Sequence, residues 1–218
     1  MRYPINETAL NTPASSPNRS YLRFFHALPN DPPVNVDIFV NNRLLVKNFK
    51  FEDFTEYLPA HPGTYHIQIF PTGNHIEQLL SIHITLEDSM SYTAAIIGTV
   101  NDISLELFSD LKGPIDENYA YMRFINLSPD TEGIDIYIDK TPVVYDINFM
   151  EATDYLQLES GKHTMEVYLT SNGERVVSHP NMVLKSGNVY TTYIVGFSKG
   201  RPYIEVLIPL EGTSYLKY

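Results

Sequence analysis

Six charged residues at repeated places in the sequence could form buried ion pairs. Each of the stretches "RFFHALPN" and "RFINLSPD" begins with an arginine that has an apolar residue on either side of it in the sequence. Each half of the chain also supplies two of the carboxylates. These residues are Arg23, Arg123, Glu106, Glu205, Asp37 and Asp135. Because the guanidinium fork fits a carboxylate through two parallel hydrogen bonds, we expect structural ion pairs across neighbouring strands. The alternative is that these arginines bind a ligand.

Other arrangements of reactive residues have less support. The seven histidines form no H-x-H, H-x₃-H or H-E-x-x-H pattern, and no G-x-S-x-G motif is present. Zinc sites and serine-hydrolase sites need such spacings. We therefore expect no catalytic residue, no cofactor and no metal centre, and predict that the protein is not an enzyme.

Ligand binding stays open as an alternative function. Acidic residues near Pro29 and Pro129 could form a calcium loop, although their spacing is loose and no D-x-D-x-D-G run is present. The sixteen tyrosines suit β-strands and could also stack on sugar rings. Calcium or a glycan is therefore the alternative ligand.

Composition limits the class of protein and its partners. The chain has 218 residues, 43% hydrophobic and 19% charged residues, and a net charge of −11. These values indicate a folded domain or two, and the acidity argues against a nucleic-acid partner. No cysteine is present, and no apolar stretch is long enough to span a membrane. Disulfides and thiol chemistry are therefore excluded.

The chain is an internal duplication. "RFFHALPN" and "RFINLSPD" align at an offset of 100 residues, with Arg23 opposite Arg123 and Pro29 opposite Pro129. After the proline the offset is 98, so that "VDIFVNN" matches "IDIYIDK" and "YTAAIIG" matches "YTTYIVG". The two-residue change is a short insertion in the loop "PNDPPVN" of the first copy.

Both copies have the pattern of short β-strands. Apolar and polar residues alternate in "NVDIFV", "TYHIQIF" and "HTMEVYL", and turn residues recur between such segments. Tight hairpins are expected at Asn41-Asn42 and Asp139-Lys140, of which the Asn pair suits a type I′ turn better. The predicted fold is all-β, with two tandem immunoglobulin-like β-sandwich domains.

Composition shifts divide the chain into five parts. These are an extended N-terminal arm (1–19), a first β-sandwich repeat (20–109), a linker (110–118), a second repeat (119–210) and a C-terminal tail (211–218). The linker is polar and broken by Gly-Pro, as expected of a domain boundary.

The repeated pattern resembles a bacterial and archaeal family known as domain of unknown function 4397. The first copy offers Arg23, His26-Ala27, Pro29 and Val36–Val40, and the second offers Arg123, Ser128-Pro129-Asp130 and Ile134–Ile138. The first copy departs from the pattern at Leu28 and Asn30, and the second has Asn126 in place of histidine. The resemblance covers residues 20 to about 208. It implies a sandwich domain, often in tandem and frequent in secreted and surface proteins, with no assigned chemistry.

The polar arm suggests how the protein could act. Its Tyr3, Pro4, Ile5 and Leu10 could add a strand to the open edge of a sandwich in a neighbouring subunit, giving a homo-oligomer or filament. We therefore expect a structural or surface protein that acts by self-assembly or adhesion, such as a fibre or spore-surface subunit. The first residues lack the apolar core of a signal peptide. The expected location is extracellular or at the spore or cell surface, after cytoplasmic synthesis without classical secretion.

Overall fold

The chain folds into two compact β-domains, each described here by itself. The structure is a computed structural model that describes residues 4–10 and 19–216. The first unit comprises the described residues up to Lys112 together with Leu216, and the second runs from Gly113 to Tyr215. The division lies within the segment predicted as a linker.

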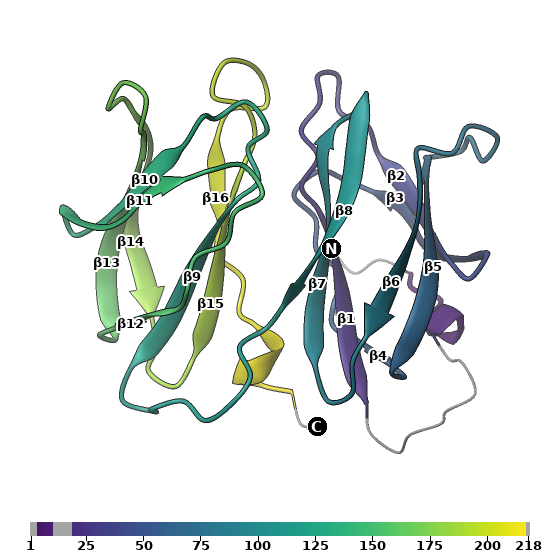
Figure 1. Cartoon of the computed structure of the whole chain (residues 1–218), viewed down its shortest axis with the longest axis horizontal. Helices are drawn as coiled ribbons and strands as arrows, with labels where there is room; N and C mark the ends of the chain where they lie inside the picture. The colour runs from purple at the N-terminus through teal and green to yellow at the C-terminus, as the bar shows by residue number, and fades with distance from the viewer. Residues whose placement is uncertain (1–3, 11–18, 217–218) are drawn as a thin grey trace. The chain divides into compact units, whose positions relative to one another are not determined.

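The first domain is a sandwich of two four-stranded sheets (Figure 1). One sheet has the order β4-β1-β7-β8 and the other the order β3-β2-β5-β6. The elements are a 3₁₀ turn η1 (Glu7–Leu10) and strands β1 (Ser20–His26), β2 (Val36–Val40), β3 (Arg43–Phe49), β4 (Leu58–Ala60), β5 (Gly63–Pro71), β6 (Leu80–Leu86), β7 (Ser91–Thr99) and β8 (Asp102–Ser109).

The second domain repeats this order strand by strand. Its sheets are β12-β9-β15-β16 and β11-β10-β13-β14. The elements are β9 (Ala120–Asn126), β10 (Ile134–Ile138), β11 (Thr141–Ile147), β12 (Leu156–Leu158), β13 (Gly161–Leu169), β14 (Arg175–Leu184), β15 (Val189–Val195), β16 (Glu205–Leu207) and the 3₁₀ turn η2 (Gly212–Ser214).

The predicted all-β fold with two tandem sandwiches is confirmed. Each domain has eight strands, and its first strand pairs in parallel with its seventh, as β1 does with β7 and β9 with β15. The seven-stranded immunoglobulin domain divides its strands differently between the sheets. The two strands of each parallel pair are the two central strands of their four-stranded sheet.

Alternating side chains fill the core between the two sheets. In β10, Ile134, Ile136 and Ile138 are buried while Asp135 and Tyr137 are half-buried on the other face. Strand β7 is buried along nearly its whole length, as expected for a central strand. The strand period of two therefore assigns each residue to the core or to the outer face.

The connections between strands also repeat. Asn41 and Asn42 have φ values of 50° and 62°, and Asp139 and Lys140 have values of 50° and 67°. Both hairpins therefore have two consecutive residues in the left-handed conformation, as a type I′ turn requires. This includes Asp139-Lys140, the pair that suits such a turn less well by residue type. The Asp139 carboxylate supports its turn by accepting a hydrogen bond from the N–H of Thr164 at 2.8 Å.

A tyrosine holds the corner before the seventh strand of each domain. The Tyr92 hydroxyl accepts a hydrogen bond from the N–H of Glu87 at 3.2 Å, and that of Tyr190 accepts one from the N–H of Lys185 at 3.1 Å. The motif is like the tyrosine corner of immunoglobulin sandwiches. Among the described residues, no helix is long and apolar enough to cross a membrane.

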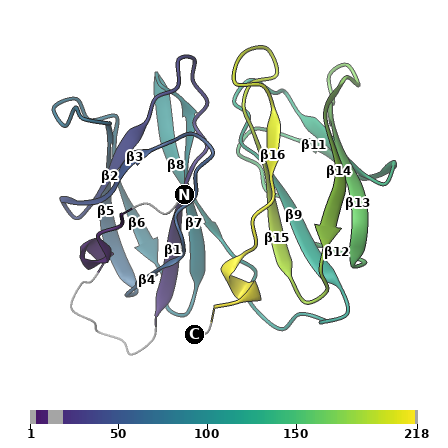
Figure 2. The ribbon, with the colours of Figure 1, turned by 180° about the vertical axis from the view of Figure 1, so that it is seen from behind.

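The N-terminal arm packs against the first domain of its own chain (Figure 2). Leu10 is fully buried in the core, Ile5 packs against that core, and Pro4 is exposed. The N–H of Asn6 donates to the Leu45 carbonyl at 3.2 Å. Tyr3 lies outside the described residues. The described part of the arm thus docks on its own domain, where Leu10 is buried in the nearest core, and docking on a neighbouring subunit stays a prediction.

Shortening the buried arm residue should destabilise the protein. Leu10→Ala is expected to lower the free energy of unfolding by about 2–5 kcal/mol, because a buried leucine loses its packing. Urea unfolding measures this loss. The control Pro4→Ala, at an exposed position, should change stability by less than about 0.5 kcal/mol. Equal effects of both substitutions would show that the arm is not docked.

Candidate functional site

Arg123 belongs to a buried network in the second domain. Its Nε donates to the Thr191 hydroxyl at 3.0 Å, and its Nη2 lies 3.0 Å from Oε1 of Glu211. The Tyr155 hydroxyl donates to the same carboxylate oxygen at 2.6 Å, and the Thr191 hydroxyl also donates to this oxygen. The Glu211 side chain is fully buried, and the Tyr155 ring lies 4.9 Å from the guanidinium carbon. Arg123 therefore forms a buried ion pair, and its partner is Glu211, which was not among the carboxylates predicted for it.

Arg23 has the same surroundings in the first domain. Its Nε donates to the Thr93 hydroxyl at 2.8 Å, and its guanidinium carbon lies 4.6 Å from the centre of the Tyr57 ring. The Tyr57 hydroxyl donates to Oδ2 of buried Asp110 at 2.7 Å. Burial raises the pKa of this hydroxyl, and Asp110 raises it further, so the group stays protonated and serves as a donor.

The carboxylates of these networks are not the predicted Glu106 and Glu205. Glu106 lies opposite Ala95, and Glu205 lies opposite Val195 and is exposed. The two glutamates are therefore not equivalent, because the loop before the last strand is longer in the second domain. In the first domain the loop begins at Gly98 and returns to it at Asp102, whose carbonyl lies against this glycine. In the second domain the loop begins at Gly196 and returns to it only at Tyr203, whose carbonyl lies against Gly196.

The acids that do match are Asp110 and Glu211. The N–H of Asp110 donates to the Ser91 carbonyl, and the N–H of Glu211 donates to that of Val189, each at 2.9 Å. Sequence reasoning placed Asp110 in the linker and Glu211 in the C-terminal tail. One signal was available in the sequence: an acid lies just beyond the last apolar segment of each copy, at Asp110 after β8 and at Glu211 four residues after the end of β16.

Asp37 and Asp135 fasten an adjacent strand and a loop instead of pairing with arginine. Asp37 accepts hydrogen bonds from the N–H of Asn48 (2.8 Å), the hydroxyl of Thr72 (2.9 Å) and the ring of His75 (2.7 Å). Burial alone would raise the pKa of Asp37, but these hydrogen bonds outweigh it and hold the pKa below its usual value.

Asp135 has the matching role in the second domain. It accepts from the N–H of Asp146 at 2.9 Å and from the Thr170 hydroxyl at 2.7 Å. At Asp37 and Asp135, where charge pairs with arginine were predicted, the carboxylates instead accept hydrogen bonds from the backbone of the adjacent strand and from loop side chains, including the His75 ring at Asp37.

Asp130 and Asp139, two of the acidic residues near Pro129 that were considered as calcium ligands, belong to separate hydrogen-bond networks. Asp130 accepts from the N–H groups of Ser198 (2.7 Å) and Lys199 (3.0 Å), while Asp139 contacts His163 at 2.7 Å. Within the described residues, no three His, Cys, Asp or Glu side chains gather as a metal ion would require. Asp130 and Asp139 therefore each support a local loop or turn through hydrogen bonds.

His26 and Asn126 hold the same loop by different chemistry. In the second domain the Asn126 amide donates to the Thr131 hydroxyl (2.8 Å) and the Ile147 carbonyl (2.9 Å). In the first domain Nε2 of His26 lies 3.0 Å from the Val34 carbonyl, and the ring packs near Phe49 and Phe51. Burial lowers the pKa of His26 to about 4, so its imidazole is neutral at pH 7.

The longer loop of the second domain builds a pocket. Residues 196–203, "GFSKGRPY", connect β15 to β16, and Asp130 fixes the loop through two backbone N–H groups. The N–H of Phe197 donates to the Pro202 carbonyl at 2.8 Å and closes the loop. Gly196, with φ of 91°, is required because a Cβ would lie 2.3 Å from the Tyr203 carbonyl oxygen.

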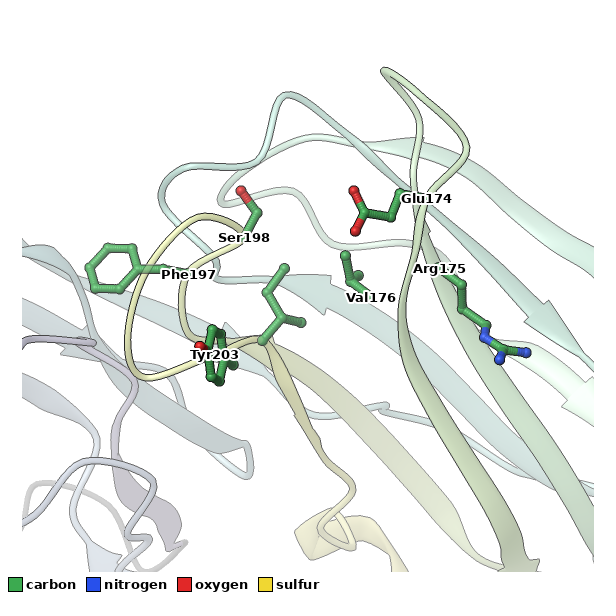
Figure 3. Close-up of a pocket in the computed structure, with 7 residues that line it drawn as sticks. Glu174, Arg175, Val176, Phe197, Ser198 and Tyr203 are labelled. Atoms are coloured by element: carbon green, nitrogen blue, oxygen red, sulfur yellow. The ribbon is translucent and has the colours of Figure 1, made fainter.

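This pocket of about 270 Å³ lies between the loop and the start of β14. Its lining residues are Glu174, Arg175, Val176, Phe197, Ser198, Tyr203 and Ile204. Figure 3 shows the Glu174 carboxylate on the side towards Ser198, whereas the Arg175 guanidinium points away and pairs with Glu166. The Tyr203 ring is 63% exposed, and the Arg201 guanidinium carbon lies 5.5 Å from its centre. The pocket thus combines an exposed aromatic ring with a carboxylate and a hydroxyl.

None of the residues singled out from the sequence lines this pocket. Sequence reasoning considered tyrosine stacking in general but did not identify Tyr203. The available signal was the extra loop length between Gly196 and Tyr203, which the sequence alignment of the copies, ending in "YTAAIIG" and "YTTYIVG", did not reach.

Comparison with known proteins assigns the family. A family model described as "Domain of unknown function (DUF4397)" matches residues 20–136 and 120–209. The chain belongs to this family, which confirms the resemblance noted from the sequence, in two copies. A search of curated proteins finds no match.

Several solved structures share a general likeness with the chain. A family 41 carbohydrate-binding module from streptococcal virulence factors is 13% identical, with 80% of this chain and 92% of that chain covered and a TM-score of 0.27. The fimbrial anchor protein Mfa2 of Porphyromonas gingivalis is 10% identical, with 89% and 98% covered and a TM-score of 0.27. A putative cell adhesion protein of Bacteroides uniformis is 8% identical, with 88% and 98% covered and a TM-score of 0.27. At these values the likenesses carry no argument about ligands, which must come from this chain's own residues.

The buried histidine predicts a loss of stability in mild acid. Because the pKa of His26 is about 4 in the folded protein and 6.5 ordinarily, only the unfolded chain gains a proton between these values. Stability should therefore fall by up to about 3 kcal/mol as the pH decreases from 6.5 to 4. Urea unfolding at a series of pH values measures the slope. His26→Asn, the side chain found at the matching position 126, should flatten it, and equal slopes in both proteins would refute the assignment.

Proposed function

We propose that this DUF4397 protein is a non-catalytic surface or adhesion protein whose second domain recognises a glycan. The observation that carries the proposal is the pocket between the β15–β16 loop and the start of β14, which has the exposed Tyr203 among its lining residues. Sugar rings present apolar C–H faces that stack on aromatic rings, and their hydroxyls bond to carboxylates and hydroxyls. Glu174 and Ser198 supply these polar groups.

The shape of the pocket supports a small ligand. Its volume is at the small end of ligand sites, which suits one or two sugar rings better than a long buried chain. The loop is rigidly supported, because Asp130 holds the N–H groups of Ser198 and Lys199. A pre-formed site reduces the ordering cost of binding.

The chemistry of the pocket also favours binding over catalysis. Among the described residues that line it, Ser198 has no histidine beside it to act as a general base. The Arg175 guanidinium pairs with Glu166 and points away from the space. The absence of enzymatic activity therefore stays part of the proposal.

Self-assembly through the N-terminal arm also stays a proposal. The described arm residues pack within their own chain, so assembly requires a second surface or an exchange of arms. A spore or cell-surface location is likewise proposed, and it is supported by the β-sandwich scaffold and by the pocket beside exposed Tyr203.

Removing the exposed ring should abolish glycan recognition. A glycan array identifies the bound sugar, and calorimetry then compares the wild type with Tyr203→Ala. We expect a loss of about tenfold or more in affinity, equivalent to about 1.4 kcal/mol, from the missing aromatic contact. The control Tyr145→Ala removes another exposed tyrosine, located on β11 and 62% exposed, and should bind normally. No binding on the array, or equal losses in both variants, would contradict the proposal.

A further inference from the structure

One edge of the first domain is covered by the N-terminal arm. The turn η1 lies against β3, β4 and β2, where the two sheets of the sandwich meet. We call this the arm-covered edge and define it by five buried residues of the same core as Leu10. These residues are Leu45, Val46, Leu58, Ala60 and Tyr65.

The second domain has a matching edge at β11 and β12. The strand pairing shows that the two edges are equivalent. Val144 is paired with Ile136 in the second domain as Val46 is with Ile38 in the first. Likewise, Leu158 is paired with Ala120 as Ala60 is with Ser20. The matching edge consists of Val143, Val144, Leu156, Leu158 and His163.

Burial differs between the two edges at all five positions. Each residue of the arm-covered edge is at most 3% exposed, whereas each residue of the matching edge is only half-buried. The four aliphatic side chains of the matching edge pack against the core of the second domain without being enclosed by it. The second domain therefore presents an apolar edge where the first has a ligand segment of its own chain.

The groups that fix the arm also have counterparts. The Tyr65 hydroxyl lies 2.7 Å from the His61 carbonyl oxygen and 3.2 Å from that of Leu10. His163 repeats the first of these contacts, with Nε2 located 2.9 Å from the Glu159 carbonyl oxygen. Leu45, whose carbonyl accepts from Asn6, sits at an irregularity of β3 that recurs at Val143 in β11.

We propose that the matching edge of the second domain binds residues 4–10 of a second copy of this chain. Ile5, Ala9 and Leu10 supply the apolar contacts, as they do in the first domain. Leu158 in place of Ala60 makes the matching edge shallower, so Leu10 is accommodated less deeply there. The interaction uses a surface distinct from the glycan pocket and does not depend on glycan binding.

The arm's own docking site sets the conditions for this interaction. The arm is covalently linked to its own first domain and therefore has a high effective concentration there. Binding of the arm to the second domain of another copy can compete with this only where the local concentration of the protein is high. Arm-to-second-domain contacts are head-to-tail and generate an open chain when the rotation does not close. A concentrated surface layer would meet both conditions.

A photo-cross-linking experiment tests the contact directly. A peptide of residues 4–10 with a photoreactive leucine analogue at position 10 is added to the full-length protein, and mass spectrometry locates the cross-links. We expect them in β11 and β12, within residues 141–158. Cross-links in residues 43–60 would show exchange with the protein's own arm and overturn the proposal, as would the absence of specific cross-links.

Substitutions provide an independent test in the same protein. Leu158→Lys should weaken binding of the fluorescently labelled peptide at least tenfold, since a charge replaces an apolar contact. Val183→Lys is the matched control, because Val183 is 53% exposed on β14 and should leave binding unchanged. Thermal unfolding confirms that both variants are folded. Unchanged binding to a folded Leu158→Lys variant would contradict the proposal.

Discussion

A buried arginine that needs a buried carboxylate is the constraint on which each domain depends. A guanidinium removed from water is strongly destabilising unless charge and hydrogen bonds replace the lost solvent. Arg123 lies on the first strand of its domain, Thr191 on the seventh, and Glu211 after the eighth. The network therefore joins the beginning of the domain to its end across one sheet. In the first domain Arg23 donates to Thr93 in the same way, and Tyr57, whose ring lies beside Arg23, donates to Asp110. The chain cannot place its last strand elsewhere without leaving an arginine unpaired.

This shared framework leaves the loops and edges free to differ between the copies. The second domain has the longer loop that forms the Tyr203 pocket, whereas the first has His26 and the docked arm. None of these features replaces a member of the arginine networks. The arginine networks are thus common to both domains, whereas the Tyr203 pocket belongs to the second domain and the buried His26 to the first. Such a division is expected of a duplicated scaffold, because function resides in sites added to a fold.

The sequence was sufficient to predict the architecture but not the partners within it. Alternation and the aligned copies predicted two sandwiches, since strand period and repeat length are local properties. Glu106 and Glu205 were wrong as partners, because the longer loop before the last strand shifts the alignment there. Asp110 and Glu211 fell outside the predicted repeats, although their side chains complete the networks. Leu10 was assigned to another subunit because burial in a core depends on three-dimensional packing that sequence pattern does not show.

A double-mutant cycle at Arg123 and Glu211 tests the constraint most directly. Urea unfolding would compare the wild type with Arg123→Met, Glu211→Gln and the double variant. Each single substitution should cost about 3–5 kcal/mol, because it leaves a buried charged or polar partner unsatisfied. The double variant should be more stable than the sum of the two losses predicts, by about 1–3 kcal/mol. Additive losses, or single losses below about 0.5 kcal/mol, would show that the buried pair does not hold the domain together.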